Sequence, residues 1–373
     1  AAIYSSDERL LFVGHENHIN LYQMQPSGWE PQKTLMTQAP AINLFLSTDG
    51  TGLLAESLEH IHLWDLTRDA CVYMLSKNSI GSTESSVSKD FAWDASQQQV
   101  AVSSSLISML EWDNNTFKFG SIKQKHIALN YVIAMSLHPN GQKLALTNES
   151  NSIYLLDLAT GDCELLTEGD PNSLIENFTY SPDGNHLIYS DRWGWVSAIN
   201  LSNKKTLTIH EGVTTYGDDE YNQTFIAISQ DSKFLATASD CSYFKDCNNE
   251  GVQLLNLATR VIKTIPLRVV SIATSYQDRQ LRALALSPKA EQLLTASSNH
   301  IYLWEVATEQ LILSQEIMGA PINCLAYSPN AIEFVIGKVD GTLALYQYSE
   351  GFLHLLDEYL NIHSEKIKLL KYL

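Results

Sequence analysis

Three segments of the chain combine aromatic with charged side chains, the residue types that dominate protein-binding hot spots. One of them places an arginine beside two tryptophans, at Arg192, Trp193 and Trp195. The other candidates are Tyr216, Asp218, Asp219, Glu220 and Tyr221 in an acidic stretch, and Tyr243 and Phe244 between two cysteines. We take these residues as a candidate partner-binding surface. The alternative is that the tryptophans pack inside the fold and that water simply solvates the acidic stretch.

Metal binding and catalysis find little support in the sequence. Asp218, Asp219 and Glu220 could offer oxygen ligands to calcium, but they lack the spacing and the glycine of a calcium loop. His60 and His62 alternate as strand residues do, rather than like metal ligands. There is no Gly-x-Ser-x-Gly elbow, phosphate-binding glycine loop or Cys-x-x-Cys motif. We therefore predict no catalytic residues, no cofactor, no metal site and no enzymatic activity.

Two of the five cysteines bear on the cellular compartment. Cys241 and Cys247 bracket a polar loop, and a disulfide between them would add about 2 kcal/mol by restricting the unfolded chain. A bridge would favour a periplasmic or extracellular location, whereas two incidental thiols would favour the cytoplasm. The other three, Cys71, Cys163 and Cys324, lie in or beside expected strands and are predicted to be buried.

Charge and hydropathy exclude two classes of partner. The formal net charge is -18, from 42 acidic and 24 basic residues, which disfavours binding to nucleic acid. No apolar stretch approaches the roughly 18 residues that a membrane-spanning segment needs. The expected partner is therefore a protein or peptide.

A strand-ending signature recurs roughly every 45 residues and organises the whole chain. Each copy is a short apolar strand that ends in an aromatic or aliphatic residue followed by a polar one. The eight copies end at Tyr22, Asp65, Asp113, Asp157, Asn200, Asn256, Glu305 and Gln347. A period of this length, built from short strands, predicts stacked four-stranded sheets.

A second signature, a tight turn between two apolar runs, precedes each copy. The turns begin at Ser5, Ser47, Asp94, His138, Ser181, Ser229, Ser287 and Ser328. Proline presets the turn dihedral, Asp or Asn bonds its own backbone, and Gly accepts positive φ. One unit then reads as four antiparallel strands, at residues 175–180, 186–190, 195–201 and 205–210.

The chain resembles the WD-repeat family over essentially its full length. The resemblance rests on the Ser-Pro-Asp-Gly turn at Ser181–Gly184 and on Trp64-Asp65, Trp112-Asp113 and Trp304-Glu305. It implies a β-propeller that serves as a scaffold for protein interactions. The family's turn Asp is kept convincingly only at Asp340, and Gly14-His15 stands in the wrong place for the family's Gly-His. We therefore expect apolar packing between sheets to carry the stability.

The predicted fold is all-β, with residues 1–373 forming one WD-repeat-like domain. It is an eight-bladed propeller of four-stranded antiparallel blades, with seven blades as the alternative. The C-terminal segment 363–373 is expected to pair beside the N-terminal blade and close the ring, unless it is a frayed tail. The long connections at residues 76–88, 210–223, 240–251 and 268–280 are expected on one face.

The predicted function follows from these expectations. We expect a monomeric, non-enzymatic scaffold that binds its partner through the face with the long loops. The alternative is an enzyme or small-ligand binder with its site at the mouth of the axial channel.

Overall fold

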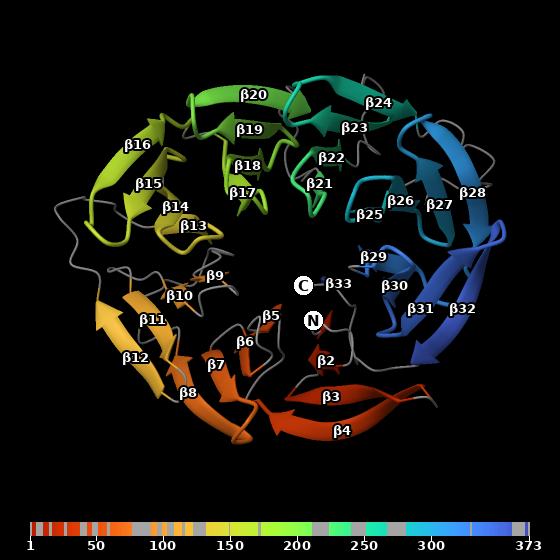
Figure 1. Cartoon of the computed structure of the whole chain (residues 1–373), viewed down its shortest axis with the longest axis horizontal. Coiled ribbons are helices and arrows are strands. Elements are labelled where there is room, and N and C mark those ends of the chain that lie inside the picture. The colour runs from red at the N-terminus through yellow and green to blue at the C-terminus, as the bar shows by residue number, and fades with distance from the viewer. Residues whose placement is uncertain are drawn as a thin grey trace. The chain divides into compact units, whose positions relative to one another are not determined.

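The computed structural model describes residues 2–4, 10–14, 17–25, 28–37, 43–46, 51–57, 60–76, 91–94, 99–102, 108–113, 116–121, 132–148, 150–170, 173–210, 224–239, 251–266, 281–328, 330–359 and 370–371. Within these ranges the regular secondary structure consists of β-strands (Figure 1). They belong to two compact units, residues 1–46, 54–58 and 224–373 in the first, and residues 47–53 and 59–223 in the second.

The first unit contains four complete sheets. In spatial strand order, they are β33 (Leu370–Lys371), β1 (Ala2–Tyr4), β2 (Leu10–Gly14), β3 (His18–Gln25) and β4 (Gly28–Met36); β21 (Thr224–Ile228), β22 (Phe234–Ser239), β23 (Gly251–Asn256) and β24 (Ile262–Pro266); β25 (Ala283–Leu286), β26 (Gln292–Ala296), β27 (His300–Glu305) and β28 (Gln310–Glu316); and β29 (Ile322–Tyr327), β30 (Glu333–Lys338), β31 (Leu343–Ser349) and β32 (Phe352–Tyr359).

The second unit contains three complete sheets. They are β9 (Phe91–Asp94), β10 (Gln99–Val102), β11 (Ser108–Asp113) and β12 (Thr116–Ser121); β13 (Val132–Leu137), β14 (Lys143–Asn148), β15 (Ile153–Asp157) and β16 (Cys163–Thr167); and β17 (Ile175–Tyr180), β18 (His186–Asp191), β19 (Val196–Asn200) and β20 (Lys205–His210). One more sheet consists of β5 (Asn43–Leu46), β6 (Gly52–Glu56), β7 (His60–Asp65) and β8 (Ala70–Ser76). Of its strands, β5 belongs to the first unit and β7 and β8 to the second.

The prediction of eight four-stranded antiparallel blades is wrong. Among the described residues, seven sheets are four-stranded, the number of the alternative prediction, and the sheet with both chain ends has five strands. In that sheet β33 pairs with β1 in parallel, through Ala2 with Leu370 and Ile3 with Lys371. The reason is that β1 would otherwise be an open sheet edge, and the C-terminal strand covers it. The predicted pairing of the C-terminal segment beside the N-terminal sheet is thereby confirmed.

The strand-ending signature coincides with a break in register between the third and fourth strands of several sheets. The shift falls at Leu21/Tyr22, Leu63/Trp64, Ile153/Tyr154, Val196/Ser197, Leu303/Trp304 and Leu345/Tyr346. A bulge of this kind increases the twist of the outer strand, which makes its free edge a poorer template for pairing with another chain.

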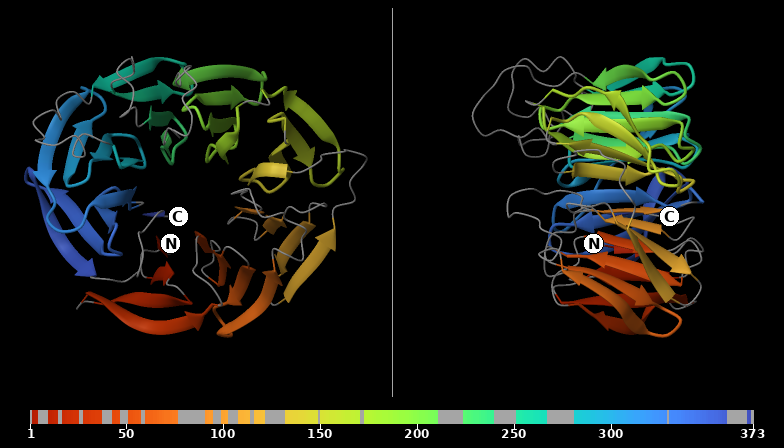
Figure 2. Two further views of the ribbon diagram at one scale, coloured as in Figure 1. Left: turned by 180° about the vertical axis from the view of Figure 1, so that it is seen from behind. Right: turned by 90° about the vertical axis from the view of Figure 1, so that its left-hand side faces the viewer.

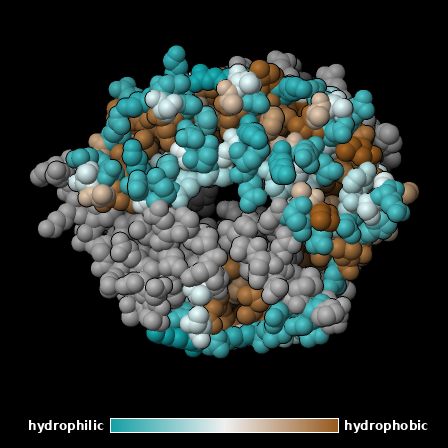
Figure 3. All heavy atoms as spheres, viewed as in Figure 1, coloured by the Kyte–Doolittle hydropathy of each residue, from teal (hydrophilic) through white to brown (hydrophobic). Residues whose placement is uncertain are grey.

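Apolar contacts join neighbouring sheets within each unit. In the first unit, Leu294 and Ile301 of one sheet share a buried cluster with Leu325, Phe334 and Ile336 of the next. In the second unit, residues of β13–β16 and β17–β20, which lie side by side in both views of Figure 2, form a comparable cluster. Each fully buried aliphatic side chain contributes about 1.5–3 kcal/mol. Figure 3 shows hydrophilic residues over much of the described part of one face, with hydrophobic ones between them.

Side-chain oxygens close the turns between first and second strands. The hydroxyl of Ser181 donates to Oδ1 of Asp183 at 2.6 Å and accepts from the N–H of His186 at 3.0 Å. Burial opposes the charge on Asp183, but hydrogen bonds from Ser181 and Asn185 outweigh it, so the pKa of this carboxyl is lowered. The same pair of bonds recurs at Ser229 and Ser328. The turn mechanism expected from the sequence is therefore confirmed at these positions.

The last residue of the third strand closes the next turn in a similar way. Its carboxylate or amide oxygen accepts hydrogen bonds from the N–H groups two and three residues later, at Asp65, Asp157, Asn200 and Asn256. The fifth residue of each turn has positive φ, at Asp69, Gly161, Lys204 and Arg260. This explains why the signature ends in Asp or Asn, whose short side chains reach the backbone of a tight turn.

The three cysteines within the described residues carry free thiols. Cys324 is buried, as predicted. Cys163 is partly exposed, and burial raises the pKa of its thiol to about 11. The prediction is wrong for Cys71, which is exposed because it lies near the start of β8, the outer strand of its sheet.

Two equivalent threonines differ in whether a tryptophan faces them. Trp304 on β27 donates its indole N–H to the hydroxyl of Thr295 on β26 at 3.0 Å, and both side chains are buried. In the β21–β24 sheet, Thr237 occupies the place of Thr295, but Leu255 occupies that of Trp304. The buried hydroxyl of Thr237 consequently has no partner among the described residues.

The variants Thr295→Val and Thr237→Val should therefore differ in stability although they remove the same hydroxyl. Thr295→Val leaves the indole N–H of Trp304 buried without an acceptor and should lower the unfolding free energy by about 1–3 kcal/mol. Thr237→Val should change it by less than about 0.5 kcal/mol or raise it. Urea denaturation followed by circular dichroism measures both. Equal losses in the two variants would contradict this account of the Trp304 bond.

Stability should also fall between neutral pH and about pH 5, in part because of His210. This side chain is 1% exposed, and burial lowers its pKa to about 4. Between that value and the ordinary pKa of about 6.5 the unfolded chain binds the extra proton, so stability decreases as the pH falls. The share from His210 is about 2 kcal/mol at pH 5. The urea midpoints of His210→Gln at about pH 7.5 and 5 should differ less than those of the wild type, whereas His354→Gln, an exposed control, should behave as the wild type.

Candidate functional site

Three of the predicted binding residues lie in one turn between β18 and β19. The turn runs from Asp191 through Arg192, Trp193 and Gly194 to Trp195. All three predicted residues are partly exposed, whereas Asp191 is 6% exposed. The turn thus places one carboxylate inward and an arginine with two tryptophans at or near the surface.

Asp191 holds the turn in one conformation. Its Oδ1 accepts hydrogen bonds from the backbone N–H groups of Trp193 and Trp195, each at 2.9 Å, and its Oδ2 accepts one from the hydroxyl of Ser173. The N–H of Gly194 donates to the carbonyl of Asp191 at 3.1 Å. Gly194 has a φ of 87°, which favours glycine at this position. The carboxylate therefore does for this turn what the strand-ending residues do elsewhere.

The arginine and the first tryptophan form a stacked pair. The guanidinium carbon of Arg192 lies 4.5 Å from the centroid of the Trp193 ring, within the range of a cation–π contact. The backbone N–H of Arg192 donates to the carbonyl of Leu174 at 2.9 Å, which fixes the base of the side chain. The pair is thus ordered at both the backbone and the side chains.

The link between β16 and β17 is fastened to this region from the other side. Asn151 donates through Nδ2 to the carbonyl of Asp170 at 2.9 Å and accepts from the N–H of Ile175 at 3.2 Å. Gly169 packs so closely that a Cβ there would lie 2.1 Å from the carbonyl carbon of Asn151. We call the turn 191–195, together with Asn151, Ser173 and Leu174, the Asp191 platform.

The remaining predicted site residues lie outside the described residues. They are Tyr216, Asp218, Asp219, Glu220, Tyr221, Tyr243 and Phe244, with the cysteines Cys241 and Cys247. Their part in binding, the calcium alternative and the disulfide stay predictions.

The sequence analysis missed Asp191, the residue that positions the others. A signal was available, because Asp-x-x-Gly after an apolar strand is typical of a turn that an aspartate caps. Ser173 and Asn151 were also missed, and no local pattern marks them, since their bonds span 18 and 24 residues.

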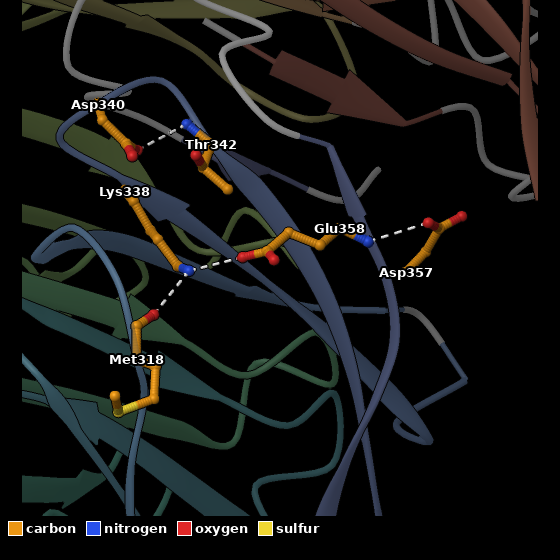
Figure 4. A network of polar contacts seen from close by, with 6 residues as sticks. All are labelled: Met318, Lys338, Asp340, Thr342, Asp357 and Glu358. Carbon is orange, nitrogen blue, oxygen red and sulfur yellow. Dashed lines mark hydrogen bonds and ion pairs between the residues drawn. The ribbon is translucent and has the colours of Figure 1, made fainter.

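The corresponding turn between β30 and β31 turns its charge inward (Figure 4). Lys338 ends β30 as Asp191 ends β18, and its side chain is 4% exposed. Its ammonium donates to the carbonyl of Met318 at 3.0 Å and to Oε1 of Glu358 at 2.7 Å. A buried cation thus anchors a loop here, where the other turn displays an arginine.

The same turn keeps the aspartate that carries the family resemblance. Asp340 accepts a hydrogen bond from the N–H of Thr342 at 3.0 Å, as Figure 4 shows. Its role is to close the turn before β31.

Two chemical possibilities can be addressed within the described residues. They hold no group of three or more His, Cys, Asp or Glu side chains placed to bind a metal ion. They also form no helix of the length and hydropathy that a membrane crossing requires.

Comparison with known proteins identifies the fold. No protein-family model and no curated protein matches the sequence. The chain is similar to the β-propeller domain of Cps50 (Swd1) from Myceliophteria thermophila, with a TM-score of 0.54, 14% sequence identity and coverage of 94% of this chain and 96% of that chain. The fold is therefore a β-propeller. Since 1797 chains of known structure match, the fold by itself does not select a function.

Removing the Asp191 carboxylate should loosen the turn without unfolding the sheet. Asp191→Ala deletes the acceptor of two backbone N–H groups, so the amides of Trp193 and Trp195 should exchange with deuterium at least about tenfold faster. Hydrogen exchange with mass spectrometry or NMR measures this. Asp183→Ala, which opens a different turn of the same sheet, is the matched control and should leave exchange at residues 193–195 unchanged. Unchanged exchange in Asp191→Ala would show that another contact holds the turn.

Proposed function

We propose that this chain is a non-enzymatic interaction module of the WD-repeat type that binds a protein or peptide partner through the Asp191 platform. The observation that carries the proposal is the Arg192–Trp193 pair, stacked at 4.5 Å on a turn fixed by a buried carboxylate. Arginine and tryptophan are among the residues most enriched in binding hot spots.

Order before binding supports this assignment. A partner that binds flexible side chains must offset about 0.5–1.5 kcal/mol for each one it immobilises. On the platform the arginine and tryptophan already hold each other, and the backbone beneath them is hydrogen-bonded. Leu174, 40% exposed, adds an apolar contact beside the polar pair. Such a mixture of apolar surface and directed charge suits a peptide segment that carries a carboxylate.

The predicted loops are proposed to extend the same surface. Tyr216, Tyr221, Tyr243 and Phe244 would add aromatic contacts, and the acids Asp218, Asp219 and Glu220 would favour basic side chains of the partner. In this arrangement, the platform is the rigid part of the interface.

The alternative of an enzyme or small-ligand binder gains no support from two well-described first strands. In β25 and β29 the residues are mainly small or apolar, as in Ala283–Leu286 and Ile322–Tyr327. A catalytic site would instead call for converging His, Asp, Glu or Arg side chains there.

Substitutions on the platform should abolish binding of the partner while the chain stays folded. Partners are captured from an extract of the native host with wild-type protein, identified, and purified for measurement of Kd. Trp193→Ala and Arg192→Ala should each weaken binding by about tenfold or more, the usual loss at a hot spot. The partly exposed position of both side chains should leave the urea midpoint nearly unchanged.

Two variants serve as matched controls. Phe352→Ala removes an aromatic side chain that is 65% exposed on β32, and Lys205→Ala removes an exposed cation on β20 of the same sheet as the platform. Both should bind as the wild type does. Equal binding by the platform variants and these controls would refute the assignment of the interface.

A further inference from the structure

Two strands in different sheets carry almost the same six residues. β7 reads His-Ile-His-Leu-Trp-Asp from His60 to Asp65, and β27 reads His-Ile-Tyr-Leu-Trp-Glu from His300 to Glu305. Apart from the acid at the end, the difference is that His62 stands where β27 has Tyr302. The repeat therefore offers an internal comparison for the role of His62.

The comparison indicates that folding does not demand a histidine at this place. Tyr302 is 5% exposed and stacks on His300, with ring centroids 6.0 Å apart and ring planes 15° apart. His62 is as well buried, at 3% exposure, yet neither of its ring nitrogens has a hydrogen-bond partner among the described residues. Burying two unsatisfied polar atoms costs about 1–3 kcal/mol each, so a ligand for the imidazole would account for the residue.

His60 lies in position to share such a ligand. The ring centroids of His60 and His62 are 5.9 Å apart, and the ring planes are tilted by 47°. Two imidazoles bound to one metal ion, with metal–nitrogen distances of about 2 Å, have centroids roughly 5–6 Å apart. Because His60 is partly exposed and His62 is buried, an ion between them could be reached from the side of His60.

Burial also leaves His62 in the form that ligates metals. The pKa of His62 is lowered, first by burial and second by the neighbouring His60. The imidazole is therefore neutral at neutral pH, and a metal ion would not have to displace a proton from it.

A third donor stands on the adjacent strand. Met74 on β8 lies opposite His62 in the antiparallel register, and its side chain is 47% exposed. Residues directly opposite each other have Cβ atoms about 5 Å apart and project from the same face of the sheet. The thioether of Met74 can therefore reach an ion held by the two rings.

We propose that His60, His62 and Met74 form a binding site for monovalent copper. Two imidazoles and a thioether are soft, neutral donors, a set that favours Cu(I) over the harder divalent ions. A structural zinc site would call for four ligands from Cys, His, Asp and Glu, and the described residues hold no group of even three placed for a metal ion.

The test is a competition for copper in the full-length chain. The five cysteines bind Cu(I) themselves, so they are reduced and alkylated with iodoacetamide before the titration. Cu(I) supplied as its bicinchoninate complex should transfer to the wild-type protein at one equivalent. His60→Gln and His62→Tyr should each weaken this binding by about tenfold or more, and Met74→Leu should weaken it measurably.

The repeat supplies the controls. His62→Tyr installs the residue type that β27 already buries, so the variant should fold, and His60→Gln alters a partly exposed side chain. His300→Gln removes the equivalent histidine of β27 and should leave copper binding unchanged. Equal copper affinity in the wild type, His60→Gln and His62→Tyr would overturn the proposal.

Methionine labelling tests the third donor independently. With 13C in the methyl groups of the six methionines, one equivalent of Cu(I) should shift the resonance that Met74→Leu removes. The shift should disappear in His60→Gln. If the Met74 methyl group does not respond in the wild type, the site of three donors is wrong.

Discussion

The hydrogen bond from a backbone N–H to a side-chain oxygen at the end of a strand is the contact on which the rest of this molecule depends. Strands of four to nine residues form most of each sheet, so the chain must reverse direction after a few residues. Each reversal leaves N–H groups without strand partners, and an unsatisfied buried N–H costs as much as a lost hydrogen bond. Ser181, Asp157 and Asn200 supply the missing acceptors at three such turns.

The candidate interface uses the same bond for a different purpose. Asp191 satisfies two N–H groups of its turn, and in doing so it fixes the direction in which Arg192 and Trp193 project. At the corresponding place in another sheet, Lys338 points inward and holds the Met318 loop. The chemistry of one strand-ending residue thus decides whether a turn displays a charged side chain or hides it. This explains how a repeated framework can carry a binding surface at one position only.

Differences between repeats are informative because the framework tolerates them. Leu255 replaces the tryptophan seen at Trp304, and the sheet keeps its register although Thr237 loses its partner. His62 replaces the tyrosine seen at Tyr302 in the same manner. Apolar packing of the surrounding strands supplies enough free energy for these sheets to accept a buried polar atom. A polar residue that packing does not require is therefore a candidate for function.

Local chemistry made much of the fold predictable from the sequence. The four-strand units, their turns and the packing between neighbouring sheets follow from strand alternation and from Ser, Asp, Asn and Gly at turn positions, all of which act over a few residues. The prediction failed at the N-terminal sheet, where β33 makes a fifth strand, because two residues of parallel pairing leave almost no pattern. It also failed for Cys71, whose exposure depends on which strand of the sheet is outermost.

The candidate site divides along the same line. The sequence by itself determined that Arg192, Trp193 and Trp195 form a cluster of binding-type residues, because their proximity is covalent. Only the tertiary structure decided that Asp191, Ser173 and Asn151 hold the cluster, and that His60, His62 and Met74 come together. These contacts join residues of separate strands and turns, and their distances depend on the register and packing of whole sheets, which no short stretch of sequence encodes.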